Sequence, residues 1–334
     1  MTSSPHKASA RAHPNIAFIK YWGNTDNRLR LPANGSISMN LDSLCTETTV
    51  SWDDTLVVDT LVLNGELQTG QPLERITEHL DVIRQLASIQ ARAQVISDSN
   101  FPIGAGIASS AAAFAALSLA ATRAAGLELS EREMSALARL GSGSASRSIP
   151  GGFVQWYNGQ THEDSYAESI ASTDHWHLVD VLAIVEPGHK RVVSSQGHQS
   201  AHTSDLQAAR IAGASERIAL CRRAILERDF PAFARVVEHD SNLMHAVMMT
   251  SQPPLFYWAP LSLTVMESIR EWRENGLRVC YTLDAGPNVH CICIGEDADQ
   301  VRSLLMTLSN TIEIRQSGPG GPAMVITDPA QVKD

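Results

Sequence analysis

A segment rich in glycine and serine, at residues 101–114, has the composition of a phosphate-binding loop. Gly104 and Gly106 carry no Cβ, so backbone N–H groups there can turn towards an anion. Ser109 and Ser110 follow where an alanine-rich helix is expected to begin, and a helix N-terminus favours phosphate. No lysine follows the second glycine, which excludes a lysine-containing P-loop. An ordinary loop that caps a buried helix would look the same, so both interpretations stay open.

Two charged residues occur where the chain is expected to be buried. Lys20 lies within an apolar strand predicted at 15–22, and an ammonium there must be paired or must reach an anion. Asp284 follows a strand predicted at 278–283 and precedes a Gly-Pro turn, so its carboxylate could orient or deprotonate a hydroxyl. The alternatives are a lysine whose head reaches water and an aspartate that only forms the turn.

A third candidate group lies in the polar Gly/Ser loop predicted at 141–148. Arg147 could bind a carboxylate or phosphate with two parallel hydrogen bonds, and Ser142 and Ser144 add hydroxyl donors. A solvated loop arginine is the alternative. The twelve histidines show no HExxH pattern, so no structural metal site is expected, and only His245 is singled out among them.

The elements that would position these groups follow from hydrophobic periodicity and turn residues. The first twelve residues are expected to fray. Strands are predicted at 15–22, 36–41, 46–52, 56–63, 93–97, 177–185, 278–283 and 290–295. Helices are predicted at 72–91, 109–125, from 130 onwards with a Ser130–Glu133 capping box, and at 204–229, 230–249, 261–275 and 297–307. Mixed runs of strands and helices favour an α+β fold.

Charge and cysteine content limit the partners and the compartment. The net charge is -10, which argues against non-specific binding to nucleic acid or to an anionic membrane. Five cysteines include no CxxC pair, as expected for free buried thiols in a reducing compartment. The first residues lack an apolar signal-peptide core and no run of about 18 apolar residues occurs. A cytoplasmic protein is therefore expected.

Together these segments resemble the diphosphomevalonate decarboxylase family of the GHMP kinase superfamily. The resemblance runs from about residue 12 to 322 as an ordered series of blocks, at 12–23 (AHPNIAFIKYWG), 31–38, 100–113, 142–153, 193–204, 244–246, 283–288 and 318–320. It implies a two-lobe α+β GHMP kinase fold, with a ribosomal protein S5 domain 2-like N-terminal lobe and a ferredoxin-like C-terminal lobe. The expected division is 1–185 for the ATP-binding lobe and 186–334 for the second lobe, and a homodimer is suggested.

The resemblance also implies a reaction that uses ATP and Mg²⁺. The family phosphorylates the 3-hydroxyl of a phosphorylated mevalonate; phosphate and CO₂ then leave and an alkene forms. By position, the catalytic residues would be Asp284 at the hydroxyl, Lys20 beside it and Arg147 on the substrate carboxylate.

The resemblance assigns binding residues as well. ATP would contact Gly104, Ala105, Gly106, Ala108, Ser109 and Ser110, with Ser110 also near the Mg²⁺ of MgATP. The substrate would contact Tyr21, Trp22, Asn24, Ser142, Ser144, Arg147 and His245.

One position departs from the family pattern. Asn24 stands where relatives that use mevalonate 5-diphosphate usually carry lysine, and the loss of one cation should weaken a diphosphate more than a monophosphate. The sequence therefore favours mevalonate 5-phosphate, giving isopentenyl phosphate. If Arg75 or Arg28 replaces the lysine, the substrate would be mevalonate 5-diphosphate and the product isopentenyl diphosphate. A mevalonate 3-kinase or a non-catalytic binding protein is disfavoured because Lys20, Asp284 and the Gly/Ser loop are all retained.

Overall fold

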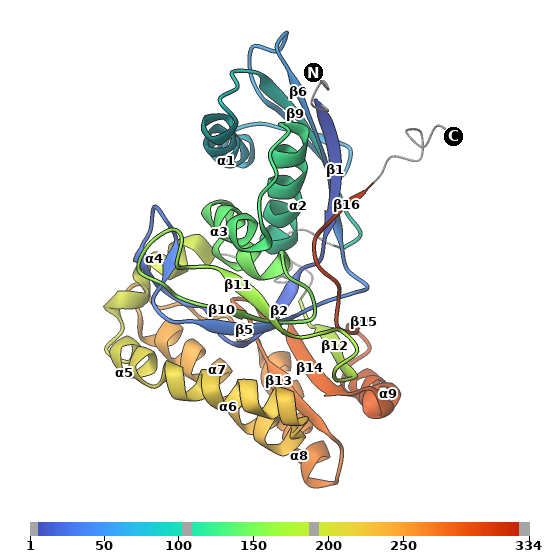
Figure 1. The fold of residues 1–334 in the computed structure, drawn as a ribbon. Helices are drawn as coiled ribbons and strands as arrows, with labels where there is room; N and C mark the ends of the chain where they lie inside the picture. The colour runs from blue at the N-terminus through green and yellow to red at the C-terminus, as the bar shows by residue number, and fades with distance from the viewer. Residues whose placement is uncertain (1–5, 102–108, 187–193, 327–334) are drawn as a thin grey trace.

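The computed structural model describes residues 6–101, 109–186 and 194–326. In the view of Figure 1, a large sheet with three helices forms the upper part, and two smaller sheets with the remaining helices form the lower part. No helix in these described stretches is long and apolar enough to span a bilayer. The structure is a two-part mixture of helices and strands, as predicted.

The large sheet has six strands. Their order is β16 (Met324–Ile326), β1 (Lys7–Ala12), β6 (Thr46–Asp53), β9 (Arg92–Ser99), β7 (Thr60–Leu63) and β8 (Glu66–Gln68). The expectation that the first twelve residues fray is wrong for 7–12, which pair with β6 along their whole length. Ala10 and Ala12 are fully buried, because side chains this small let the strand pack closely against a helix.

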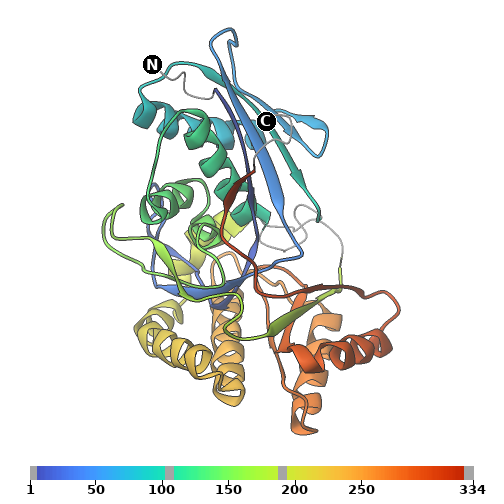
Figure 2. The same ribbon diagram turned by 45° about the vertical axis from the view of Figure 1, so that its right-hand side comes forward.

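Helices α1 (Gln71–Ala87) and α2 (Ser109–Ala124) cover one face of this sheet (Figure 2), and α3 (Glu131–Gly141) packs against both helices. Helix α2 is buried on nearly every side, as its alanine-rich sequence predicts. The predicted capping box is confirmed: the Ser130 side chain accepts from the Glu133 backbone, and the Glu133 side chain accepts from the Ser130 backbone. The capping box therefore fixes the start of α3 at Glu131.

The second sheet lies between α3 and the lower helices. Its order is β11 (Ala167–Ala171), β10 (Phe153–Trp156), β5 (Ser36–Asn40) and β2 (Asn15–Ile19). A short hairpin of β3 (Asn24–Asp26) and β4 (Leu31–Pro32) follows β2. The loop predicted at 141–148 is instead largely a 3₁₀ helix, η1 (Gly143–Ser148), because small residues there pack closely against Tyr21 and α2.

The third sheet has the order β13 (Val279–Thr282), β14 (Val289–Ile294), β12 (Leu178–Ile184) and β15 (Glu313–Ser317). The other elements of this part are α4 (Ser194–Ser200), η2 (Ala201–Thr203), α5 (Gln207–Ala212), α6 (Ala214–Glu227), α7 (Phe230–Thr250), α8 (Pro260–Glu274), η3 (Gly295–Asp297) and α9 (Ala298–Leu308). Helix α7 contacts both β2 and β13, so it joins the second sheet to the third.

Candidate active site

Lys20 comes directly after β2, and its whole side chain is buried. Its Nζ donates to Oδ1 of Asp284 at 2.7 Å, and the lysine side chain is only 1% exposed. Because burial penalises the ammonium, the pKa of Lys20 is lowered, and the neighbouring Asp284 carboxylate opposes that shift. The sequence prediction that this buried lysine needs an acidic partner is met by a residue 264 positions away.

The peptide of Lys20 is fixed from three sides. Its N–H donates to Oδ2 of Asp240 at 2.6 Å, and its carbonyl accepts from Arg210 at 2.7 Å and from Asn34 at 2.9 Å. The other oxygen of Asp240 accepts from Nε of Arg217 at 2.7 Å. Asp240 is completely buried, and Arg217 supplies the opposite charge that a buried carboxylate requires.

Asp284 lies on the segment that leaves β13. Helix α7 holds the start of this segment, because the Leu283 N–H donates to Oγ of Ser241 at 3.0 Å. The Asp284 side chain is 25% exposed, so one end of the Lys20–Asp284 pair remains open to solvent or to a ligand. An ionised carboxylate in this position can accept a proton from a hydroxyl placed beside it.

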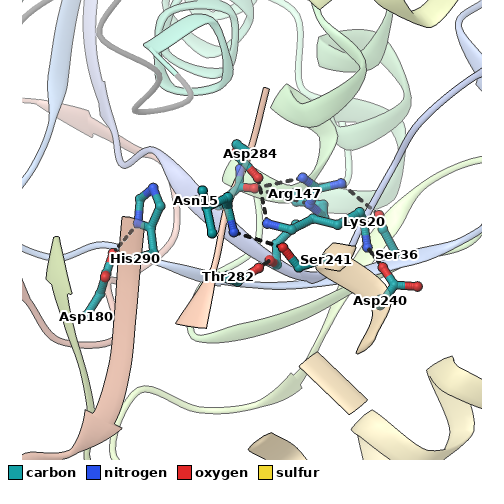
Figure 3. Close-up of polar contacts among 12 residues, drawn as sticks. Asn15, Lys20, Ser36, Arg147, Asp180, Asp240, Ser241, Thr282, Asp284 and His290 are labelled. Carbon is teal, nitrogen blue, oxygen red and sulfur yellow. Dashed lines mark hydrogen bonds and ion pairs between the residues drawn. The ribbon is translucent and has the colours of Figure 1, made fainter. Parts of the chain in front are cut away.

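Arg147 of η1 lies beside Lys20 and close to Asp284 (Figure 3). Its guanidinium donates through Nε and Nη2 to Oδ1 of Asn15, at 3.1 and 3.0 Å, and through Nη1 to Oγ of Ser36 at 2.7 Å. Burial lowers the pKa of Arg147 to about 10, and the nearby Asp284 charge opposes this shift. Arg147 is only 4% exposed. Among the described residues, no carboxylate forms an ion pair with it.

These three predicted residues therefore meet at one place. Two cations and one carboxylate carry a net positive charge, and Asp240 is already balanced by Arg217. A buried excess of positive charge is stabilised by an anionic ligand. The arrangement suits a substrate that brings both a hydroxyl for Asp284 and negative groups for the two cations.

Serine hydroxyls connect this point to the N-terminus of α2. Oγ of Ser142 lies 3.1 Å from Oγ of Ser110 and 3.4 Å from that of Ser144. Ser109 and Ser110 open helix α2, as predicted. The other predicted phosphate-loop residues, Gly104, Ala105, Gly106 and Ala108, lie outside the described residues.

The donors near α2 suit Mg²⁺ when it arrives with a nucleotide. Ser109 and Ser110 offer hard oxygen atoms, the ligand type that Mg²⁺ prefers, and nucleotide phosphates and water would complete its coordination. No group of three His, Cys, Asp or Glu side chains that could bind a metal occurs among residues 6–101, 109–186 and 194–326. Ser110 therefore stays the predicted contact to MgATP.

Tyr21 and Asn24 lie on the other side of the serines. The Tyr21 hydroxyl donates to Oδ1 of Asn24, and Asn24 in turn donates to Oδ1 of Asn27 at 3.0 Å. Gly143 packs so closely on the Tyr21 ring that an added Cβ would lie 2.6 Å from it. This contact explains why a glycine stands between Ser142 and Ser144.

The two remaining predicted substrate residues have different surroundings. Trp22 is 2% exposed and packs in a hydrophobic cluster with Ala201, Met244, Met248, Leu255 and Ala285. His245 of α7 is buried against Trp258, with ring centroids 5.0 Å apart. Burial, together with the charge of Lys20, lowers the pKa of His245 to about 3, so its ring is neutral at pH 7. Whether either side chain contacts a substrate stays a prediction.

Sequence reasoning missed several residues of this site. In the sequence, Asp240 is an ordinary acidic residue of a predicted helix, and Asn15 and Ser36 are polar residues of predicted strands. His198 is also new: its ring stacks on Tyr21 with centroids 4.2 Å apart and its Nδ1 accepts from the Gly23 N–H at 3.0 Å. Only the burial predicted for 15–22 and 36–41 could have drawn attention to Asn15 and Ser36.

Comparison with known proteins agrees with this geometry. Residues 12–167 match the diphosphomevalonate decarboxylase-like N-terminal domain, and residues 180–322 match the mevalonate 5-diphosphate decarboxylase C-terminal domain. A diphosphomevalonate decarboxylase of Candida albicans is 40% identical over 317 residues, covering 90% of this chain and 88% of the relative. A phosphomevalonate decarboxylase of Haloferax volcanii is 33% identical over 323 residues, covering 96% and 98%.

Solved structures agree as well. A mevalonate diphosphate decarboxylase from Staphylococcus aureus has a TM-score of 0.92 and 38% identity, covering 96% of this chain and 98% of its own. The complex of MDDEF with MVAPP, AMPPCP and magnesium also has a TM-score of 0.92, at 35% identity, covering 96% and 99%. The fold is thus that of the GHMP kinases. Within that class, the chain belongs to the diphosphomevalonate decarboxylase family.

Proposed function

We propose that this protein is an ATP-dependent decarboxylase of phosphorylated mevalonate, with mevalonate 5-phosphate as its preferred substrate. The observation that carries the reaction class is the buried Lys20–Asp284 pair beside Arg147, a guanidinium for which no described residue supplies an ion-paired carboxylate. MgATP is the second substrate. The products are isopentenyl phosphate, ADP, phosphate and CO₂.

The first step is phosphoryl transfer to the 3-hydroxyl. Asp284 accepts the hydroxyl proton while the oxygen attacks the γ-phosphorus, and ADP leaves with the electron pair of the broken P–O bond. Lys20 holds the carboxylate in place and lies where it can also balance charge on the transferred group. Positioning and electrostatics are most of what this kind of transfer requires.

The second step is fragmentation. The C3–O bond breaks and phosphate takes the electron pair, which leaves positive character at C3. The C1–C2 bonding electrons then form the C2=C3 double bond, and CO₂ departs. Arg147 orients the substrate carboxylate with its planar fork, which Asn15 and Ser36 fix in direction.

Asn24 is the reason for preferring the monophosphate. Its amide carries no charge and is engaged by Tyr21 and Asn27, so this position adds no cation at the phosphate end. A phosphomevalonate decarboxylase from Haloferax volcanii aligns with nearly the full length of this chain.

Decarboxylation of mevalonate 5-diphosphate is the second candidate. Most of the curated relatives bear the name diphosphomevalonate decarboxylase, and this favours the diphosphate over the monophosphate. Family membership alone therefore supports the second candidate better than the first, and the monophosphate proposal depends on Asn24.

A direct comparison of the two substrates tests the proposal. We expect kcat/KM for mevalonate 5-phosphate to exceed that for the diphosphate by at least about tenfold, the worth of one charge-assisted hydrogen bond. Asn24→Lys should shift the ratio towards the diphosphate. A wild-type preference for the diphosphate would replace the first candidate by the second, and no ADP with either compound would remove both.

A further inference from the structure

Arg30 is an inward-facing cation that the proposed mechanism does not yet use. It occupies the turn between β3 and β4 and has a φ of 50°, in the left-handed region that costs a non-glycine residue about 1–2 kcal/mol. From there its Nε–H donates to the carbonyl of Leu140 at 2.8 Å, at the end of α3. Ser142 and Gly143 follow immediately, and Gly143 touches the Tyr21 ring.

Arg30 lies near other cations, and the charges of Glu78, Glu163 and Asp26 also reach this group of arginines. Its charge acts on Tyr21, on His79 of α1 and on Arg75 of α1. Arg139 of α3 is tied to neutral groups, with Nη1 donating to the Ser165 carbonyl at 3.0 Å.

No ion pair to a carboxylate is formed by Arg30, Arg75 or Arg139 within the part of the chain that the structure describes. Like charges repel, so such a group is stable beside an anion. Acidic residues outnumber basic ones by 36 to 26 in this chain, so three arginines without an ion-paired carboxylate in the described structure are unexpected and indicate a site for an anionic ligand.

Arg30 also differs from the cations that the sequence offered as replacements for a lysine at position 24. Arg28 is exposed, and Arg75 lies over the Phe114 ring with its guanidinium carbon 5.1 Å from the ring centre. Arg30 uses only Nε for its Leu140 contact, so the paired N–H groups of Nη1 and Nη2 remain for a ligand. A planar fork of this kind matches phosphate oxygens.

We propose that Arg30 binds the 5-phosphate of the substrate and so contributes to the selection of a phosphorylated mevalonate. This inference rests on the proposed function only in requiring a phosphorylated mevalonate as substrate. Arg147 then holds the carboxylate end, and the charges of both arginines act on Tyr21. A purely structural alternative exists, in which Arg30 only caps α3 through Leu140.

Kinetics of Arg30→Gln separate the two roles, with Arg28→Gln as the matched control on the same turn. For Arg30→Gln we expect KM for mevalonate 5-phosphate to rise about 10- to 100-fold, as for loss of a charge-assisted hydrogen bond, with kcat changed less than about threefold. The inhibition constant of unphosphorylated mevalonate should stay within about twofold, since that compound lacks the phosphate. Equal KM values in the two variants, or a parallel rise for mevalonate, would overturn the inference.

A second measurement needs no variant. Phenylglyoxal modifies arginines, and peptide mass spectrometry reports Arg30 and exposed Arg28 separately in the wild-type protein. Mevalonate 5-phosphate should slow modification of Arg30 at least about fivefold and mevalonate should not, whereas Arg28 should react equally in both, because a bound phosphate shields only the guanidinium it contacts. Equal modification of Arg30 with both compounds would refute its contact with phosphate.

The two proposals fail in different ways. If the wild type prefers the diphosphate but Arg30→Gln raises KM for it, the monophosphate preference is wrong and the role of Arg30 stands. If the wild type prefers the monophosphate and Arg30→Gln behaves as Arg28→Gln does, the role of Arg30 is wrong and the preference stands.

Discussion

Buried ionisable side chains in this protein are kept in one protonation state by their surroundings. Lys20 and Arg147 lose solvation but are drawn towards the charge of Asp284. Burial makes His79 and His245 neutral at pH 7, and at His245 the charge of Lys20 adds to this effect and outweighs the opposing charge of Asp284. The neutral histidines matter for stability, because the unfolded chain can protonate them and the folded chain resists it.

The pH dependence of stability should reveal His79. Burial, with a smaller contribution from Arg30, lowers its pKa to about 4 from 6.5. Its stabilising contribution is therefore complete above pH 6.5 and is lost as the pH falls from 6.5 towards 4. Between pH 7.5 and 5.5, wild type should lose about 1 kcal/mol more unfolding free energy than His79→Gln. Urea denaturation at both pH values measures this.

Glutamine keeps a donor for Ser118, which lies 2.8 Å from Nε2 of His79, so the variant removes titration with little loss of contact. His202→Gln, at an exposed position, serves as the control and should follow wild type. Identical losses in all three proteins would show that His79 does not stay neutral in the folded state.

Individual residues differ in how well the sequence alone predicts them. Lys20 stands out because its neighbours are apolar, and Asp284 because it ends a buried strand before a Gly-Pro turn. Arg30 does not, because its partner Leu140 is 110 positions away and nothing in the sequence indicates that its side chain turns inward. Asp240 is missed for the same reason, since its bond to Lys20 spans 220 positions.

At the scale of elements, helix α7 holds the second and third sheets in a fixed position relative to each other. It contacts β2 and β13, and two consecutive residues on it hold the chain on both sides: Asp240 binds the Lys20 peptide and Ser241 binds the Leu283 peptide. One rigid helix therefore sets the distance between the ammonium of Lys20 and the carboxylate of Asp284.

Removing the charge of Asp240 should disturb this positioning. In Asp240→Asn the amide oxygen can still accept one bond, but Arg217 loses its ionic partner inside the protein, which costs about 3–5 kcal/mol. We expect kcat to fall about tenfold or more with KM for ATP nearly unchanged, because a small displacement of Lys20 affects the reacting groups. Steady-state kinetics and thermal unfolding report both effects.

Arg217→Met with Asp240→Asn is the matched control, since the double variant leaves neither charge unpaired. It should recover part of the lost stability and none of the lost kcat if Asp240 acts through Lys20. Recovery of both together would mean that Asp240 serves the fold alone.

Regular elements were more predictable than irregular ones. The helices at α1, α2 and α3 and the strands at β6 and β9 follow directly from periodicity and caps. Strand β1 is short, polar in part and rich in alanine, so its burial depends on β6 and α2, which local sequence does not reveal. The 3₁₀ helix η1 depends likewise on contacts with Tyr21 and α2.

At the scale of the whole molecule, the site combines distant parts of the chain. Lys20 and Arg147 come from the first half of the chain and Asp284 from the last sixth. The chain also returns from the third sheet to the first: β12 pairs with β14 and β15, and the later strand β16 pairs with β1. The division near residue 185, the homodimer and the cytoplasmic location stay predictions. The ordered series of family blocks is visible in the sequence, and the family and fold could be predicted from it. The net charge of the assembled site could not, because it depends on which distant residues meet.

The most direct test of the account is CO₂ release by Asp284→Asn, measured together with ADP at saturating MgATP and phosphorylated mevalonate. Asparagine keeps the size of the side chain but can neither accept the hydroxyl proton nor pair with Lys20. Wild type should release one CO₂ per ADP, and the variant should release both about 10²- to 10⁴-fold more slowly while binding ATP with unchanged affinity. CO₂ release by the variant at more than a tenth of the wild-type rate, or ADP without CO₂ from wild type, would contradict the account.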